Sequence, residues 1–331
     1  MTRVLVTGAG GPAGVAAIRS LLHRANVDVF SADMDGWASG LYLVDGDHRS
    51  IVPPGAAAGF VDGVMQRCTA DRIDVLFSTV DSELLPLARR RRELESRGTS
   101  LAAPARATLE VALDKFALAE RCAPLLRVPV TVLLDGDGIG MPWRFPVIVK
   151  PRRGSGSRGV RLIGGRAALE ALVPDGDTII QEHLPGAEYS VDVIAEAGRV
   201  VAAVPRSRER VDSGVSIAGR TVRDAQLERT AAAAAHAIAL NGVANVQLRR
   251  DRDGMPALLE INPRFPGAMP LTIAAGVDLP SLALDLALGI PLPEHIDYAE
   301  LANVRFLEDV FLDPSEILSS EHAAHDEGGA R

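Results

Sequence analysis

A strand, a glycine-rich turn, a helix and a second strand follow one another in the first 33 residues. The run RVLVTG leads into GAGGPAG, VAAIRSLLHR has the composition of a helix, and VDVFSAD returns to strand-forming residues. Two strands joined through a helix run parallel, because the helix carries the chain back to the edge where it began. The sequence therefore predicts an opening parallel sheet with crossover helices, to which RIDVLFST adds a further strand.

The composition is that of an ordinary soluble protein with more than one domain. The chain has 331 residues, of which 47% are hydrophobic and 24% charged, and its formal net charge is −8. An acidic molecule repels nucleic acid as a whole, so we interpret the arginine-rich stretch within a predicted helix at Ser82–Arg97 as a solvated surface. Cys68 and Cys122 lie far apart without metal-ligand spacing, which favours a reducing compartment. Because no signal peptide or membrane-spanning run is recognisable, we expect a cytoplasmic protein without nucleic-acid or membrane partners.

The pattern of predicted secondary structure changes near Asp114. Short strands now alternate with turns in FPVIVK, GVRLIG, TIIQEHL and EYSVDVIAEAGRVVAAVPR, and Gly198 predicts a hairpin turn within the last of these. A helix is expected in DAQLERTAAAAAHAIAL, where alanine supplies high helix propensity. ANVQLRRDRDGMPALLEINPR reads as two strands joined at Asp253-Gly254. PSLALDLALG has the pattern of an amphipathic helix, and the final SSEHAAHDEGGAR is polar.

A first cluster of glycines stands between the opening strand and its helix. This is where a dinucleotide could meet a helix N-terminus, and Asp33 ends the next strand at the place of a ribose-binding acid in nicotinamide enzymes. The alternative is that the glycines only permit a tight turn and close packing of helix on sheet. The cluster consists of Gly8, Gly10, Gly11 and Gly14.

A second cluster of glycines follows a predicted strand that ends at Lys150. Pro151 prevents simple continuation of that strand, so the chain can fold into a loop whose N–H groups face a phosphate chain. A lysine suits such a site because its ammonium acts as a point charge on phosphate oxygens. A flexible surface hairpin is the alternative for the loop alone. Its small residues are Gly154, Ser155, Gly156, Ser157 and Gly159.

A set of oxygen-bearing side chains lies in the last predicted hairpin. Glu260 and Asn262 are two residues apart in a strand and so point to the same face. Gln247 is available on the preceding strand, and magnesium prefers oxygen ligands. Arg264 follows directly, where it could meet an anionic oxygen.

Taken together, Lys150 with its glycine–serine loop, IIQEHLPGAEYSVDV and NVQLRRDRDGMPALLEINPR resemble the ATP-grasp superfamily. The pattern is most similar to the ATP-grasp unit of the carbamoyl-phosphate synthetase large subunit and to single-unit carboxylate–amine ligases. The resemblance covers most of the chain, and its motifs are specific in combination. It implies an α/β fold with a Rossmann-like pre-ATP-grasp domain at 1–113 and an ATP-grasp domain at 114–311, in which two α+β lobes hold ATP between them. The small lobe would cover about 135–183, and 312–331 would be a polar C-terminal tail.

The resemblance also implies a role for each matching residue. Lys150 and Arg264 match catalytic residues, Arg264 as the group that stabilises the reaction intermediate, and Glu188 matches the acid that binds the ribose hydroxyls. Gln181 to Leu184 match the hinge against which adenine lies, with Glu182 and Leu184 using backbone groups. The implied ATP-binding residues are Lys115, Lys150, Gly154, Ser155, Gly156, Ser157, Gly159, Gln181, Glu182, His183, Leu184 and Glu188. The implied magnesium ligands are Gln247, Glu260 and Asn262.

Some positions differ from the residues usual in the family, and some further polar residues need an interpretation of their own. Many relatives have an acid where this chain has Gln247, and an acid where it has Gln181. His183 and His236 are expected to be packing residues rather than bases. Arg206 is a candidate for binding a substrate carboxylate, together with Arg264, and a solvated hairpin end is the alternative for Arg206.

The implied activity is that of an ATP-dependent ligase. A substrate carboxylate would attack the γ-phosphate to form an acyl phosphate, ADP would leave, and an amine would displace phosphate to form an amide bond. We expect an amino acid or another small carboxylate as substrate, a biosynthetic role, and two Mg²⁺ ions that Mn²⁺ can replace. A homodimer is considered as one assembly. An NAD(P)-dependent oxidoreductase that uses the first glycine cluster is the alternative, but it leaves Lys150 and Glu260 without a role; a nucleotide-binding regulatory protein that has lost turnover is a third.

Overall fold

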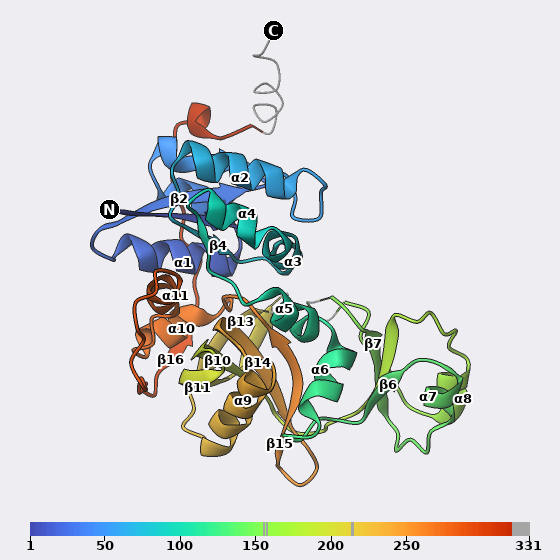
Figure 1. Cartoon of the computed structure of the whole chain (residues 1–331). Coiled ribbons are helices and arrows are strands. Elements are labelled where there is room, and N and C mark those ends of the chain that lie inside the picture. The colour runs from blue at the N-terminus through green and yellow to red at the C-terminus, as the bar shows by residue number, and fades with distance from the viewer. Residues whose placement is uncertain (155, 157, 213–214, 320–331) are drawn as a thin grey trace.

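The computed structural model describes residues 1–154, 156, 158–212 and 215–319. Figure 1 shows three parts: an N-terminal domain, a large lobe beneath it, and a small lobe that projects to one side. The mixed α/β architecture, with one parallel sheet followed by antiparallel sheets, is the one that the sequence predicted.

The N-terminal domain contains a parallel sheet in the order β3-β2-β1-β4-β5. Val4 and Val6 pack on the side of α1 while Leu5 packs on the side of α2, so the sheet is buried on both faces. The strands are β1 (Thr2–Thr7), β2 (Val27–Asp33), β3 (Arg49–Ile51), β4 (Val75–Ser78) and β5 (Ser100–Leu101). The helices are α1 (Pro12–Leu22), α2 (Phe60–Ala70), α3 (Asp81–Arg89) and α4 (Arg91–Ser96), and η1 (Ser39–Leu43) and η2 (Gly46–His48) are single 3₁₀ turns.

The helix expected over Ser82–Arg97 is in fact two helices, α3 and α4, separated at Arg90. Arg90 leaves the helical conformation, with φ −107° and ψ 18°. Arg91 then turns inward and donates to the carbonyl oxygens of Leu101 at 2.7 Å and Pro104 at 3.0 Å. The arginine run is therefore only partly a solvated surface, since one of its members ties α4 to the segment that follows β5.

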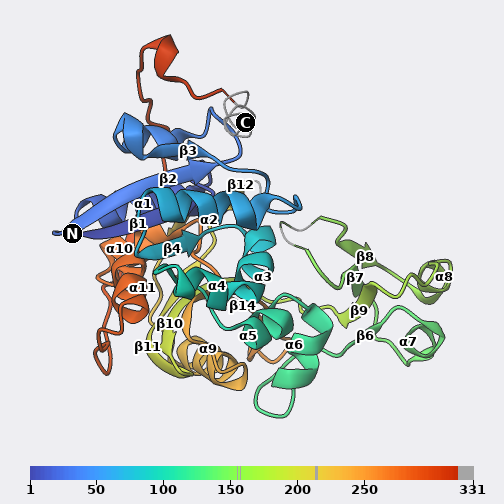
Figure 2. The ribbon, with the colours of Figure 1, turned by 45° about the horizontal axis from the view of Figure 1, so that its top comes forward.

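The small lobe is an antiparallel sheet in the order β6-β9-β7-β8 with two short helices on it. Figure 2 shows it reaching outward from the rest of the molecule. Its elements are β6 (Thr131–Leu133), α7 (Gly136–Gly140), β7 (Val147–Pro151), β8 (Arg161–Ile163), α8 (Arg166–Glu170) and β9 (Thr178–Glu182). α5 (Arg106–Ala112) and α6 (Lys115–Cys122) lead into it from the N-terminal domain.

The large lobe has an antiparallel sheet in the order β11-β10-β14-β15. Both hairpins that the sequence predicted are confirmed: β10 pairs with β11 around Gly198, and β14 pairs with β15 around Gly254. The strands are β10 (Glu188–Glu196), β11 (Arg199–Ser207), β14 (Gly242–Arg250) and β15 (Pro256–Asn262). A smaller sheet contains β12 (Arg210–Asp212), β13 (Val215–Arg220) and β16 (Ala302–Val304), and the helices are α9 (Ala225–Ala237), α10 (Met269–Ala274) and α11 (Leu279–Ala287).

One hydrophobic core joins the N-terminal domain to the large lobe. Val6 of β1 and residues of α1 share a buried cluster with Val204 of β11 and Leu284 of α11. The chain returns to the N-terminal domain after the large lobe, where η3 (Pro314–Glu316) is followed by Leu318, whose N–H donates to the hydroxyl of Tyr42 at 3.1 Å. The two parts are thus held together by apolar packing and by a returning segment, which fixes the space between them.

Candidate active site

A single row of side chains crosses all four strands of the large-lobe sheet. Ser190 is paired with Arg206 on one side and with Gln247 on the other, and Gln247 is paired with Glu260. Directly opposed residues of antiparallel strands point to the same face, so the row spans about 14 Å over three strand spacings. A second row, two residues along, contains Asn245 and Asn262. The register of the hairpins therefore brings Arg206 and the three predicted metal ligands to one face.

This face forms the floor of a cleft of about 1170 Å³. The large volume suits a nucleotide together with a further small molecule, because single-ligand pockets are usually about 300–1,000 Å³. The N-terminal domain contributes Gly11, Pro12, Ala13, Thr79, Val80 and Asp81 to the wall, and the small lobe contributes Lys150, Gly154, Gly156 and Arg158.

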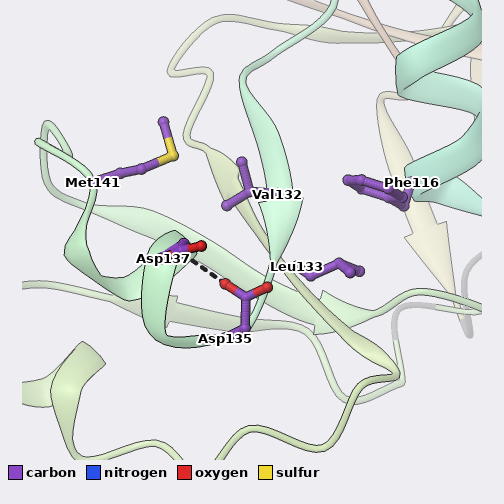
Figure 3. Close-up of a pocket in the computed structure, with 7 residues that line it drawn as sticks. Phe116, Val132, Leu133, Asp135, Asp137 and Met141 are labelled. Carbon is purple, nitrogen blue, oxygen red and sulfur yellow. Dashed lines mark hydrogen bonds between the residues drawn. The ribbon is translucent and has the colours of Figure 1, made fainter.

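A smaller cavity of about 250 Å³ lies beside α6 and the small lobe. Figure 3 shows Val132 and Leu133 of β6 between Phe116 and the pair Asp135 and Asp137. The carboxylate of Asp135 accepts a hydrogen bond from the N–H of Gly138 at 2.7 Å and so caps α7. Of the predicted site residues that the structure describes, none lines this cavity.

Lys115 and Lys150 both reach the cleft, close to Glu260. The Nζ of Lys115 donates to the carbonyl oxygen of Gly154 at 2.6 Å and lies 3.8 Å from Oε2 of Glu260. Burial lowers the pKa of Lys150 to about 8, an effect that the negative charge of Glu260 partly offsets. Lys150 is 8% exposed. This part of the cleft therefore places the cations of Lys115 and Lys150 near the carboxylate of Glu260, an arrangement that suits a polyanion.

The loop after Lys150 has the backbone of a glycine-dependent turn. Gly154, Gly156 and Gly159 all have positive φ, and around Gly154 there is open space where a side chain would stand. Ser155 and Ser157, which were predicted to bind ATP, lie outside the described residues.

The predicted adenine hinge begins within the last two residues of β9 and lines the cleft. The carboxylate of Glu182 accepts from Arg127 at 2.9 Å and from the N–H of Val130 at 3.1 Å, and the N–H of Glu182 donates to the carbonyl oxygen of Val130 at 2.8 Å. Gln181 donates to the hydroxyl of Thr131 at 2.9 Å. Leu184 is buried and His183 is partly exposed, with a pKa lowered by burial and by the nearby charges of Arg249 and Arg252. His236, in contrast, is exposed on α9 and is not the packing residue that was expected.

Glu188, the predicted ribose acid, is also at the cleft. Its Oε1 accepts from Arg208 at 2.5 Å, and its Oε2 lies 3.8 Å from Arg249. These arginines hold the carboxylate at the start of β10, where it lines the cleft.

Arg264 has a partner that sequence analysis missed. Its Nε donates to Oδ1 of Asp81 at 2.9 Å, and both side chains line the cleft. Asp81 is the first residue of α3, so this ion pair links the N-terminal domain to the large lobe. The signal available in the sequence was only an acid after a strand, which does not specify a partner 183 residues away.

Arg206 lies at the floor of the cleft in a buried network. Its Nε and Nη2 donate to the two oxygens of Asp192 at 2.9 and 2.7 Å, and the side chains of Arg206 and Asp192 are 3% and 0% exposed. Asn245 and Thr272 also donate to Asp192. The alternative of a solvated hairpin end is therefore wrong for Arg206, because the carboxylate of Asp192 fixes its guanidinium beneath the cleft.

The donor set of Gln247, Glu260 and Asn262 fits an oxygen-preferring cation. It offers one carboxylate and two carboxamides, and Nδ2 of Asn262 donates to Oε1 of Glu260 at 3.3 Å. Within the described ranges, no group of three or more His, Cys, Asp or Glu side chains is arranged to hold a metal. A single carboxylate balances only part of the charge of Mg²⁺, so a phosphate ligand is needed to complete such a site.

The first glycine cluster is explained by packing. Gly10 donates its N–H to Oδ2 of Asp33 at 2.8 Å, and Asp35 donates to Oδ1 at 3.1 Å. Added at Gly14, a Cβ would stand 2.2 Å from the carbonyl oxygen of Gly8. Asp33 thus ties the turn after β1 to the end of β2, and the close approach at Gly14 agrees with the packing alternative.

Comparison with known proteins finds similarity to ATP-grasp sequences over part of the chain. Residues 175–310 match the family model "ATP-grasp in the biosynthetic pathway with Ter operon", and residues 4–102 match "PylC-like, N-terminal domain". Carnosine synthase 1 of Gallus gallus is 32% identical in an alignment of 178 positions that covers 44% of this chain and 19% of that protein. The carbamoyl phosphate synthase large chain of Clostridium acetobutylicum is 26% identical over 45% of this chain and 16% of its own length. D-alanine–D-alanine ligase of Nitrosococcus oceani is 30% identical over 43% of this chain and 52% of its own length.

The fold is shared with solved structures. Biotin carboxylase from Campylobacter jejuni, in a β-γ-ATP complex, superimposes with a TM-score of 0.72 at 18% identity, over 88% of this chain and 72% of that one. The curated relatives are longer than the matched region: this chain spans less than a fifth of the first two and about half of the third. The predicted ATP-grasp resemblance and fold are confirmed, and the matches give no support to the oxidoreductase alternative.

Proposed function

We propose that this chain, which has the sequence pattern and the fold of an ATP-grasp protein, is an ATP-dependent carboxylate–amine ligase. It forms an amide bond through an acyl phosphate and releases ADP and phosphate. The observation that carries the proposal is the single cleft in which Lys115, Lys150 and Glu260 stand beside Arg264 and Arg206. Phosphate-binding groups and carboxylate-binding groups lie within one space, as a transfer between phosphate and carboxylate requires.

Each part of the cleft has a role in this proposal. The hinge from Gln181 to Leu184 receives adenine through its main chain, and Glu188 receives the ribose hydroxyls. Lys115, Lys150 and the glycine loop hold the triphosphate. Their cations offset the negative charge of the outer phosphates, which lowers the barrier to attack by a carboxylate.

The metal site belongs to the same proposal. Gln247, Glu260 and Asn262 would hold Mg²⁺, in one or two ions, with Mn²⁺ as a replacement. The bound ion supplies charge neutralisation on the outer phosphates. Fixing the donors on adjacent strands sets their spacing before any ligand arrives.

Arg206 and Arg264 are proposed to bind the substrate carboxylate and the acyl phosphate. Arg206 is oriented by Asp192, so it offers its guanidinium without a further cost in side-chain ordering. Arg264 is held by Asp81 and would exchange that contact for the phosphate oxygens of the intermediate. The carnosine synthase and D-alanine ligase similarities support an amino acid or another small carboxylate as substrate.

No helix among the described residues combines the length and apolar character needed to cross a bilayer. We propose small molecules as the reaction partners, a cytoplasmic location and, as one assembly, a homodimer. Size-exclusion chromatography with light scattering tests the assembly directly.

The activity is tested by supplying Mg²⁺-ATP with a mixture of the common L-amino acids whose carboxylates carry heavy oxygen. We expect ADP and phosphate as products, with one label per turnover in the phosphate. AMP, pyrophosphate or unlabelled phosphate would rule out the acyl-phosphate mechanism. Glu260→Gln should fold normally and lose at least about a hundredfold in turnover, because removing one group that stabilises transition-state charge typically costs about 10²–10³ in rate. Unchanged turnover in this variant would remove the metal assignment.

A further inference from the structure

Asp114 lies outside the cleft but contacts both segments that carry the proposed phosphate lysines. It stands between α5 and α6, is 3% exposed, and is not among the residues that line the cleft. A carboxylate so deeply buried needs several donors to remain charged. Asp114 has them on two sides.

On one side, Asp114 caps the helix that begins with Lys115. Its Oδ1 accepts from the N–H of Phe116 at 3.1 Å and of Ala117 at 3.2 Å. These are N–H groups that a helix leaves without partners in its first turn. Asp114 thereby fixes where α6 begins and from which direction Lys115 enters the cleft.

On the other side, Asp114 holds the two arginines that follow the strand of Lys150. Arg152 donates its Nε to both oxygens at 2.7 and 2.8 Å, and Arg153 donates Nη2 to Oδ2 at 2.7 Å. Burial alone would raise the pKa of Asp114, but the hydrogen bonds from Arg152 and from the N–H of Ala117 hold it below its ordinary value. The carboxylate is therefore ionised at neutral pH.

Two further contacts tie the same segments together. The N–H of Lys115 donates to the carbonyl oxygen of Arg152 at 3.0 Å, and Nζ of Lys115 donates to that of Gly154. Lys115 and Lys150 come from different elements, so their spacing depends on this junction. Asp114 is its centre, since it binds the start of α6 and the end of β7 at once.

We infer that Asp114 is a positioning residue, which sets the spacing of Lys115 and Lys150 so that both act on the phosphate chain of one nucleotide. The inference rests on the proposed ATP site. Replacing a residue with this role should lower nucleotide affinity more as the number of phosphates increases. Adenine and ribose would be unaffected, because in the proposed site they bind at Gln181–Leu184 and Glu188. A group that only stabilised the fold would affect AMP, ADP and ATP analogues alike.

The test replaces Asp114 by asparagine and measures the affinities of AMP-PNP, ADP and AMP by calorimetry with Mg²⁺ present. Asp114→Asn keeps an oxygen for the helix cap but removes the charge that holds Arg152 and Arg153. We expect an affinity loss of about tenfold or more for AMP-PNP, the equivalent of one charge-assisted hydrogen bond, a smaller loss for ADP and none for AMP.

Asp224 provides a matched control. It caps α9 through the N–H groups of Gln226 at 2.9 Å and Leu227 at 3.2 Å, it pairs with Arg250, and neither it nor Arg250 lines the cleft. Asp224→Asn removes the same kind of charge from the same kind of cap, and it should leave all three affinities unchanged.

Arg152→Gln gives the same test from the opposite side of the junction and leaves the helix cap intact. Arg152 does not line the cleft, so its replacement should reproduce the dependence on phosphate number. If both variants bind AMP-PNP as the wild type does, or lose the three nucleotides equally, the inference is overturned while the ATP site stands. If the wild type binds none of the nucleotides, the proposed function falls and this inference falls with it.

Discussion

The chain has two glycine-rich turns that look alike as sequence and differ in what surrounds them. In the turn after β1, a Cβ on Gly10 would stand 2.7 Å from the side chain of Ala38, and one on Gly14 would stand 2.2 Å from a backbone oxygen. In the loop after Lys150, Gly154 has open space and Gly156 meets only the end of Arg158 at 3.9 Å. At Gly10 and Gly14 the protein already fills the space that a side chain would need, although Gly11 lines the cleft. Gly154 and Gly156 also line the cleft, and no close neighbour surrounds them.

The difference separates two uses of glycine. In the first turn glycine lets the backbone of α1 approach β1, and Asp33 accepts the N–H of Gly10. In the second loop glycine supplies positive φ at Gly154 and Gly156, where no close neighbour stands. We expect substitutions in the first turn to alter stability, and substitutions around the second to alter nucleotide affinity.

The largest expected effect is that of Gly14→Ala on the free energy of unfolding. The new methyl group collides with the backbone at Gly8 and Ala9, which cannot move aside as a flexible side chain could, so we expect a loss of about 3 kcal/mol. Gly11→Ala is the control in the same turn, since its Cβ would be 3.5 Å from the nearest atom and its φ is −73°. It should cost about 1 kcal/mol or less, the usual range for an N-cap change. Denaturant titration measures both, and equal losses would contradict the packing explanation.

The next effect in size is that of Lys150 on nucleotide binding and its pH dependence. With a pKa near 8, its ammonium is charged below that pH and neutral above it, and only the charged form attracts phosphate. AMP-PNP affinity should therefore be steady up to about pH 8 and then fall as the pH rises toward 9.5. Lys150→Met should weaken binding at pH 7 by about 1.5–3 kcal/mol and abolish this fall. A decline above pH 8 that persists in Lys150→Met would assign it to another group.

The smallest expected effect is that of Gly156→Ala. An L-residue at φ +70° costs about 1 kcal/mol, so the substituted loop should relax from this conformation in the free protein. If AMP-PNP binding needs the conformation with φ +70°, its affinity should fall about fivefold. The unfolding free energy should change little, because the methyl group meets no close neighbour. Parallel calorimetry and denaturant titration separate the two quantities. A loss of stability as large as that of Gly14→Ala would remove the distinction between the turns.

Much of the site could be predicted because it depends on local periodicity. The alternation within β14 and β15 placed Glu260 and Asn262 on one face, and the turns at Gly198 and Gly254 specified the pairing of the hairpins. The row that joins Arg206 to Glu260 follows from this register. It also depends on the bulge beside Gln247, where Gln247 pairs with Glu260 but Leu248 pairs with Leu258. That extra residue cannot be located from alternation alone.

The rest depends on contacts between residues far apart in the chain. Asp81 and Asp192 look like ordinary surface or strand acids until the fold places Arg264 and Arg206 against them. The end of α3 at Arg90 is likewise decided by tertiary contacts, since Arg91 turns toward carbonyl oxygens beyond β5. In each case the partner is set by how the domains pack, which no local pattern contains.

The return of the chain to the N-terminal domain has a consequence for synthesis on the ribosome. Leu312, Ile317 and Leu318 pack against the first hydrophobic core, and Leu318 binds the hydroxyl of Tyr42 across 276 residues of sequence. The parallel sheet is translated first, but the surface around Tyr42 stays uncovered until residue 318 has left the exit tunnel. The domain whose sheet is translated earliest is therefore among the last to be completed, and in the interval the apolar surface that Leu312, Ile317 and Leu318 cover is exposed to solvent.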